Sequence, residues 1–219
     1  MIRRDYVMRQ IQELVQVLAR ALFLRSQGEY EAALKEIGRA LKALDPATNI
    51  EALDAQGWLD LCRRHEDVVG PLMEVTGSLL RERAASLEAA GRPEESGRAR
   101  AAGLTLQLEA ILSAAVPVTT ELLAQVDADI GALPVEALPS PALSRLVSYF
   151  EQRGQLGMAE DILFDWLDRG DAKAVASGRA FYDRLARMND EALDSGGLSR
   201  SEIEAGRSDL EHRASPDVS

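Results

Sequence analysis

The sequence is poor in cysteine, in aromatic residues and in long apolar runs, and each shortage excludes a class of protein. A single cysteine, Cys62, cannot form a disulfide within the chain, which is typical of a reducing compartment. Aromatic residues make up only 5 % of the chain, and an apolar content dominated by alanine and leucine favours helices over strands. No apolar run approaches the ~20 residues that span a bilayer, and no signal-peptide pattern opens the chain. We therefore expect a cytoplasmic, helical protein that does not enter membranes.

Positive charge is also scarce, since 25 Lys and Arg oppose 36 Asp and Glu for a net charge of −11. Such a chain repels phosphate backbones, so we do not expect a nucleic-acid partner. Phosphate-binding glycine loops, serine elbows and His-Glu-x-x-His motifs are lacking as well. Cys62 and His65 lie three residues apart, but a zinc site needs about four ligands and the only other histidine is His212. We expect no metal, no cofactor and no enzymatic activity.

Caps and breakers divide the chain into amphipathic helices. Capping-box spacing at Thr48 and Glu51, and again at Ser199 and Glu202, predicts two helix starts. The pattern predicts an all-α chain of about nine or ten helices without a sheet. The expected helices cover residues 2–27, 29–44, 49–65, 70–90, 92–113, 119–130, 141–153, 155–168, a segment ending before 196, and 199–212.

Three glycines occupy equivalent places between pairs of these helices. Gly28, Gly91 and Gly154 are each separated from the next by 63 residues, and each is suited to end a helix with a positive φ. The first hairpin matches the tetratricopeptide consensus, in which small residues allow two helices to approach closely. The matching residues are Ala21, Gly28, Tyr30, Ala33, Ala40 and Pro46. We therefore expect tetratricopeptide-like hairpins stacked into an α-α superhelix.

The later hairpins depart from that consensus. In the second, Pro93 stands at the aromatic position and Gly103 at a later alanine position. In the third, Val147 and Trp166 occupy positions for small residues. Some tetratricopeptide domains hold a C-terminal carboxylate with Lys and Asn on their first helices, but Leu18 and Leu22 occupy the matching positions here. That carboxylate clamp is therefore not expected in the first hairpin.

The chain also resembles a narrower group of proteins. The opening Met1-Ile-Arg-Arg-Asp5-Tyr6, followed by Gly28-Glu-Tyr-Glu-Ala-Ala-Leu, is similar to an uncharacterised bacterial family of tetratricopeptide-like proteins. The later segments Ala159-Glu-Asp-Ile-Leu-Phe164 and Gly196-Gly-Leu resemble the longer members of that family. The resemblance implies a domain of unknown function and the same helical fold, and it implies no activity.

These observations predict a protein-binding scaffold in two parts. The stretch 131–141 contains one Gly and three Pro, so we expect an N-terminal subdomain over 1–130, a second subdomain over 131–212 packed on it, and a flexible tail at 213–219. A protein or peptide partner would bind in a groove formed by the first helices of the hairpins. By consensus position the groove residues are Arg25, Arg81, Glu88, Ser148, Glu151 and Gln152. The alternative is a self-association module that forms a homodimer.

Overall fold

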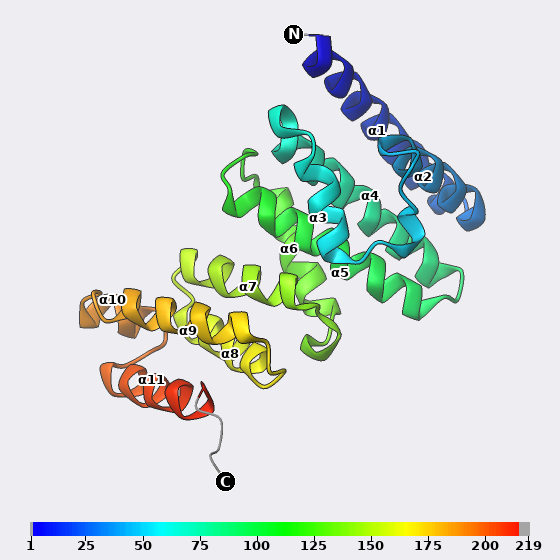
Figure 1. Cartoon of the computed structure of the whole chain (residues 1–219). Helices are drawn as coiled ribbons and strands as arrows, with labels where there is room; N and C mark the ends of the chain where they lie inside the picture. The colour runs from blue at the N-terminus through cyan, green and yellow to red at the C-terminus, as the bar shows by residue number, and fades with distance from the viewer. Residues whose placement is uncertain (1, 215–219) are drawn as a thin grey trace. The chain divides into compact units, whose positions relative to one another are not determined.

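The structure, a computed structural model, describes residues 2–214, and the side chains of 8–66 and 68–214. Over these residues the chain consists of helices joined by turns, without a strand (Figure 1). The α-helices are α1 Ile2–Ser26, α2 Tyr30–Leu44, α3 Ala55–Arg63, α4 Val69–Ala89, α5 Pro93–Leu112, α6 Thr120–Ala132, α7 Ser140–Gln152, α8 Leu156–Leu167, α9 Ala172–Leu185, α10 Asp190–Ser195 and α11 Arg200–Ala214. Short 3₁₀ turns are η1 Ile50–Ala52, η2 Glu66–Val68 and η3 Val135–Ala137. The predicted all-α class is confirmed.

The chain divides into two compact units, Met1–Ala142 and Leu143–Ser219. The stretch 131–141, which we interpreted as a joint, lies at the end of the first unit rather than at the start of the second. In the first unit, α1 packs beside α2 and α4, and α4 pairs with α5 over most of their lengths. In the second unit, α9 packs against α8 and α11. Helix α11 continues to Ala214, so the predicted tail begins inside that helix, and residues 215–219 lie outside the described part.

The three glycine turns share one geometry. Gly28, Gly91 and Gly154 have φ values of +78°, +76° and +70°. In each turn the glycine N–H donates to the carbonyl three residues earlier at 3.0 Å, and the next N–H donates to the carbonyl five residues before it at 2.9 Å. Only glycine adopts this left-handed conformation without strain. The positive φ predicted for Gly28 is confirmed. The same pattern of hydrogen bonds recurs at Gly197, where φ is +85°, so this geometry is that of a helix ended by glycine and does not depend on the 63-residue spacing.

Helix starts follow side-chain caps, although not always those predicted. The capping box at Ser199 is confirmed, because the Glu202 carboxylate accepts from both the N–H and the hydroxyl of Ser199. The box at Thr48 is wrong. The Thr48 hydroxyl donates back to Asp45, while α3 is capped by Asp54, which accepts from the N–H of Gly57 at 2.7 Å. A second difference is α10, which starts at a cap from Asn189 and brings the described helices to eleven.

The α1–α2 hairpin allows a direct test of its packing. Ala33 is fully buried in α2, which packs against α1, whereas Ala43 is exposed on the same helix. We expect Ala33→Leu to lower the free energy of unfolding by about 1–3 kcal/mol because it overpacks a filled contact. We expect Ala43→Leu to change it by less than about 0.5 kcal/mol. Thermal melts in which both variants match the native chain would contradict a close α1–α2 approach.

Candidate functional site

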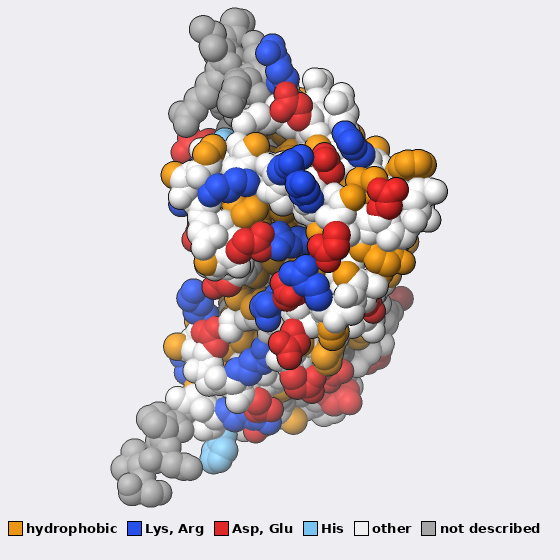
Figure 2. Space-filling model, turned by 90° about the vertical axis from the view of Figure 1, so that its right-hand side faces the viewer, with side chains coloured by type: hydrophobic (Ala, Val, Ile, Leu, Met, Phe, Trp, Pro, Cys, Tyr) orange, Lys and Arg blue, Asp and Glu red, His pale blue; other side chains and the backbone are white. Residues whose placement is uncertain are grey.

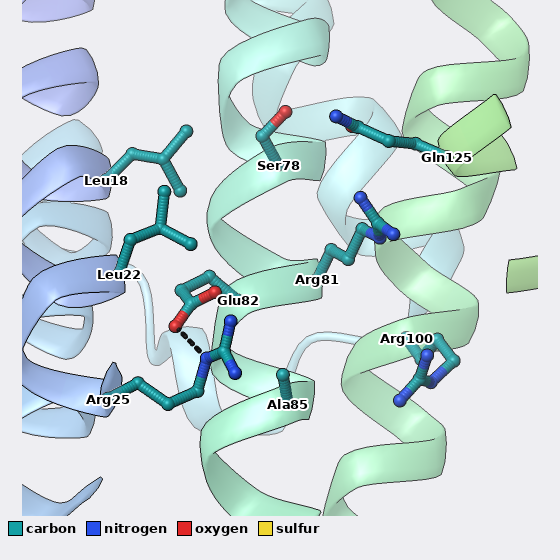
Figure 3. Close-up of a pocket in the computed structure, with 9 residues that line it drawn as sticks. All are labelled: Leu18, Leu22, Arg25, Ser78, Arg81, Glu82, Ala85, Arg100 and Gln125. Atoms are coloured by element: carbon teal, nitrogen blue, oxygen red, sulfur yellow. Dashed lines mark hydrogen bonds and ion pairs between the residues drawn. The ribbon is translucent and has the colours of Figure 1, made fainter. Parts of the chain in front are cut away.

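A pocket of about 240 Å³ lies between α1, α4, α5 and α6 in the N-terminal unit (Figure 3). Helix α1 contributes two leucines and an arginine, and the facing side, mainly from α4, is mostly polar. The lining residues are Leu18, Leu22, Arg25, Ser78, Arg81, Glu82, Ala85, Arg100 and Gln125. Their positions follow from helical periodicity, since residues three, four or seven apart share a face. On α1 these are 18, 22 and 25, and on α4 they are 78, 81, 82 and 85.

Arg25 is held in the pocket by a buried carboxylate. Its Nε donates to Oε1 of Glu82 at 2.6 Å (Figure 3), and the side chain of Glu82 is only 5 % exposed while that of Arg25 is 38 % exposed. The hydrogen bond to Glu82 raises the pKa of the Arg25 guanidinium. Because the bond uses Nε alone, both terminal nitrogens of Arg25 keep their N–H donors for other acceptors.

A second buried carboxylate holds the other two arginines. The side chain of Asp129, on α6, is fully buried; its Oδ2 lies 3.1 Å from Nε of Arg81, and its Oδ1 accepts from Nη1 of Arg100 at 3.1 Å. Burial raises the pKa of Asp129, and the two guanidinium groups oppose that rise. Nη2 of Arg100 also donates to Glu88 at 2.8 Å. The Nε of Arg81 therefore forms an ion pair with a buried carboxylate, whereas the Nε of Arg25 donates a hydrogen bond to one.

This arrangement is suited to holding an anion beside an aliphatic group. Charge-assisted hydrogen bonds from guanidinium to carboxylate are about twice as strong as neutral ones, and here the guanidinium groups are already fixed by their Nε contacts. Leu18 and Leu22 add apolar surface to the same pocket. Pockets for metabolites and cofactors usually measure about 300–1,000 Å³, so this one has room for one or two side chains of another chain.

The structure brings together some of the residues predicted to line a groove. Arg25 and Arg81 share the pocket, and Glu88 stands beside it through its contact with Arg100. The other three, Ser148, Glu151 and Gln152, lie on α7 in the second unit. There the Glu151 carboxylate accepts two hydrogen bonds from Arg184.

Two residues of the pocket were not predicted from the sequence, because they lie outside the first helices of the hairpins. Arg100 lies on α5 and Gln125 on α6, whereas the consensus assigns grooves to first helices only. Arg100 could have been found from its spacing. It lies three residues before Gly103, on the same face of α5, and Gly103 is a position at which this hairpin departs from the consensus.

The cysteine of the chain has a different role. Cys62 is fully buried in α3, and burial raises the pKa of its thiol to about 12, so the thiol stays protonated at neutral pH. His65 lies beyond the end of α3. Among the described residues, no three His, Cys, Asp or Glu side chains gather as a metal site requires. Cys62 therefore acts as a small packing residue.

Comparison with known proteins identifies a family. The model of a family of unknown function, DUF6483, matches residues 1–215. No curated protein and no solved structure matches the chain. Over the described residues, every helix is too short or too polar to cross a membrane.

Proposed function

The chain belongs to the DUF6483 family of unknown function, and we propose that it is a non-enzymatic scaffold whose arginine-lined pocket binds a protein or peptide partner. The observation that supports this proposal is the fixing of Arg25 and Arg81. Each contacts a buried carboxylate through Nε, and each lines the pocket that Leu18 and Leu22 of α1 also line. The chemistry fits an Asp or Glu side chain, or a C-terminal carboxylate, that follows or precedes an aliphatic residue.

The surface charge favours such a partner over a nucleic acid. Figure 2 shows Lys and Arg side chains interspersed with Asp and Glu over the face that it draws. A nucleic-acid site needs a stripe or patch of one positive sign, whereas a local cluster of arginines within an acidic chain selects a short acidic segment. The chain carries a net charge of −11, so acidic partners that lack the matching local contact are repelled.

The finer features of the proposal concern architecture and location. Three helix pairs, each joined at a glycine turn, support a tetratricopeptide-like superhelix. One free, buried cysteine supports a cytoplasmic location, in which thiols remain reduced.

Peptide selection tests the proposal with the full chain. Phage libraries that display internal and free C-terminal peptides are selected on the native chain and counter-selected on a pocket variant. We expect enrichment of peptides with Asp, Glu or a C-terminal carboxylate beside Leu, Ile, Val or Met. The affinity of an enriched synthetic peptide is then measured by fluorescence anisotropy.

The pocket variant removes a cation together with its buried partner. Arg25→Gln combined with Glu82→Gln leaves no unpaired buried charge, so the fold should be retained. We expect this double variant to weaken peptide binding about tenfold or more, because charge-assisted hydrogen bonds contribute about 1.5–3 kcal/mol each. The control is Arg39→Gln on α2, where the side chain is 67 % exposed and lies outside the pocket. Failure to enrich any motif, or equal binding by all three chains, would reject the pocket as the binding site.

A further inference from the structure

Helix α11 is held against α9 by few apolar contacts. Of the 15 residues of α11, all of them described, only Ile203 and Leu210 are buried. Leu210 packs on Gly178 of α9, since a Cβ added to that glycine would lie 3.0 Å from a methyl carbon of Leu210. Two ion pairs with side chains that are about half exposed also join the helices: Arg179 with Glu211, and Arg207 with Asp183. Exposed ion pairs contribute little to stability, so a modest change in the rest of the contact can release α11.

The backbone of α11 covers a hydrogen bond between a carboxyl group and a phenol. Tyr182 of α9 is fully buried, and its hydroxyl donates to Oε1 of the half-buried Glu160 on α8 at 2.6 Å. Gly206 of α11 lies against this pair, because a Cβ added there would be 2.6 Å from the same Oε1 and closer still to the tyrosine oxygen. Helix α11 therefore removes water from the Glu160–Tyr182 pair as long as it stays in place.

Among the described residues, Glu160 has no cationic partner. The charged groups that act on it are both negative, Asp161 of its own helix and Glu202 of α11. Asp209 of α11 acts on Tyr182, and the arginines between α9 and α11 are bound to other carboxylates. Burial raises the pKa of Glu160, the hydrogen bond from Tyr182 opposes this rise, and the two negative neighbours add to it.

We propose that α11 is a pH-sensitive latch, which closes over Glu160 and Tyr182 while Glu160 is protonated and opens once Glu160 is ionised. A half-buried carboxylate without a cation is stabilised by water, and water reaches Glu160 more fully when α11 leaves. A carboxyl group whose pKa is raised in the closed state favours closure below its ordinary pKa of 4.5, and this contribution is lost as the pH rises through the closed-state pKa. The pKa of Glu211 is lowered by Arg179, so that pair weakens only in more acid solution. We therefore expect the tightest closure in mildly acid solution.

Hydrogen exchange of the full chain, followed by mass spectrometry and corrected for intrinsic exchange rates, measures the opening of α11 from about pH 5 to about pH 8. We expect the protection of the α11 amides to fall with rising pH by up to about tenfold per pH unit, the limit for release of one proton, and then to level off. The amides of α8 are the internal reference. A loss of protection that is confined to α11 distinguishes the latch from global unfolding.

Glu160→Gln tests the group itself, because glutamine keeps the acceptor for Tyr182 and never ionises. In this variant α11 should stay closed over the whole pH range, with protection at neutral pH about tenfold above that of the native chain. Tyr182→Phe removes the donor to the carboxylate and should extend the pH-dependent loss of protection to higher pH. The control is Glu204→Gln, which makes the same change of charge at an exposed position of α11 and should behave as the native chain does.

Three results would overturn the latch. The first is native protection of α11 that does not change with pH, and the second is a Glu160→Gln variant that keeps the native pH profile. The third is a loss of protection in α8 that accompanies the loss in α11, because the unit would then unfold as a whole. Since native chain and variant differ only at Glu160, the difference between their pH profiles separates this group from every other titrating group of α11.

Discussion

Gly103→Ala in α5 is expected to lower the free energy of unfolding by about 1–3 kcal/mol. A Cβ at this position would lie 2.9 Å from the carbonyl oxygen of Gly77 and 3.3 Å from the backbone nitrogen of Arg81. A Cβ on Gly77 would in turn lie 3.0 Å from the carbonyl oxygen of Gly103. Because the obstructing atoms belong to the backbone, α4 and α5 must move apart along the longest helix contact of the N-terminal unit.

The control for this prediction lies in the same helix. A Cβ at Gly97 would have open space around it, and the backbone there is helical. Gly97→Ala should therefore raise the free energy of unfolding by up to about 1 kcal/mol, the difference in helix propensity. Urea unfolding followed by circular dichroism measures both variants. Changes in unfolding free energy of opposite sign for the two variants would support a close contact between α4 and α5. A stabilising Gly103→Ala would show that the two helices can accommodate a Cβ at this position.

Arg100→Met is expected to cost about 3 kcal/mol at neutral pH, because removal of one partner from a buried ion pair leaves charge uncompensated. The side chain of Asp129 is fully buried and would keep only Arg81. Asp129→Asn in the same background should recover most of the loss. The control is Arg98→Met, at an exposed position of the same helix, which should change stability by about 0.5 kcal/mol or less.

The effect of pH on this variant has a defined sign. Burial already raises the pKa of Asp129, and Arg100 opposes that rise, so the variant should raise the pKa further. A carboxyl with a raised pKa stabilises the fold while it is protonated, below its unfolded pKa, and this stabilisation is lost as the pH rises through the folded pKa. The loss caused by Arg100→Met should therefore be small in acid and grow toward neutral pH. Urea unfolding at several pH values measures this loss of unfolding free energy. A loss that does not change with pH would show that Arg100 does not stabilise the charged form of Asp129.

The contrast between correct and wrong predictions has a local explanation. The glycine at 28 and the box at Ser199 need only a few neighbouring residues, and both occur as predicted. The box at Thr48 fails because Asp45 competes for the hydroxyl of Thr48, while Glu51 pairs with Arg83 of α4 instead. Of the groove residues predicted by consensus, only some line one pocket, because their meeting depends on how separate helices pack. Arg25 and Arg81 meet because α1 packs on α4, a contact between helices more than forty residues apart in the sequence.

The sequence alone determined the helical class, most helix boundaries and the three glycine turns, because helix propensity, capping and positive φ act over a few residues. It also showed Gly103 to be an exception to the consensus without giving the reason. Only the tertiary structure supplied that reason, the approach of Gly77, and only it joined Arg81 and Arg100 through the buried carboxylate of Asp129. These contacts join α4, α5 and α6, and their energies come from burial and from charge compensation across separate helices, which no local pattern encodes.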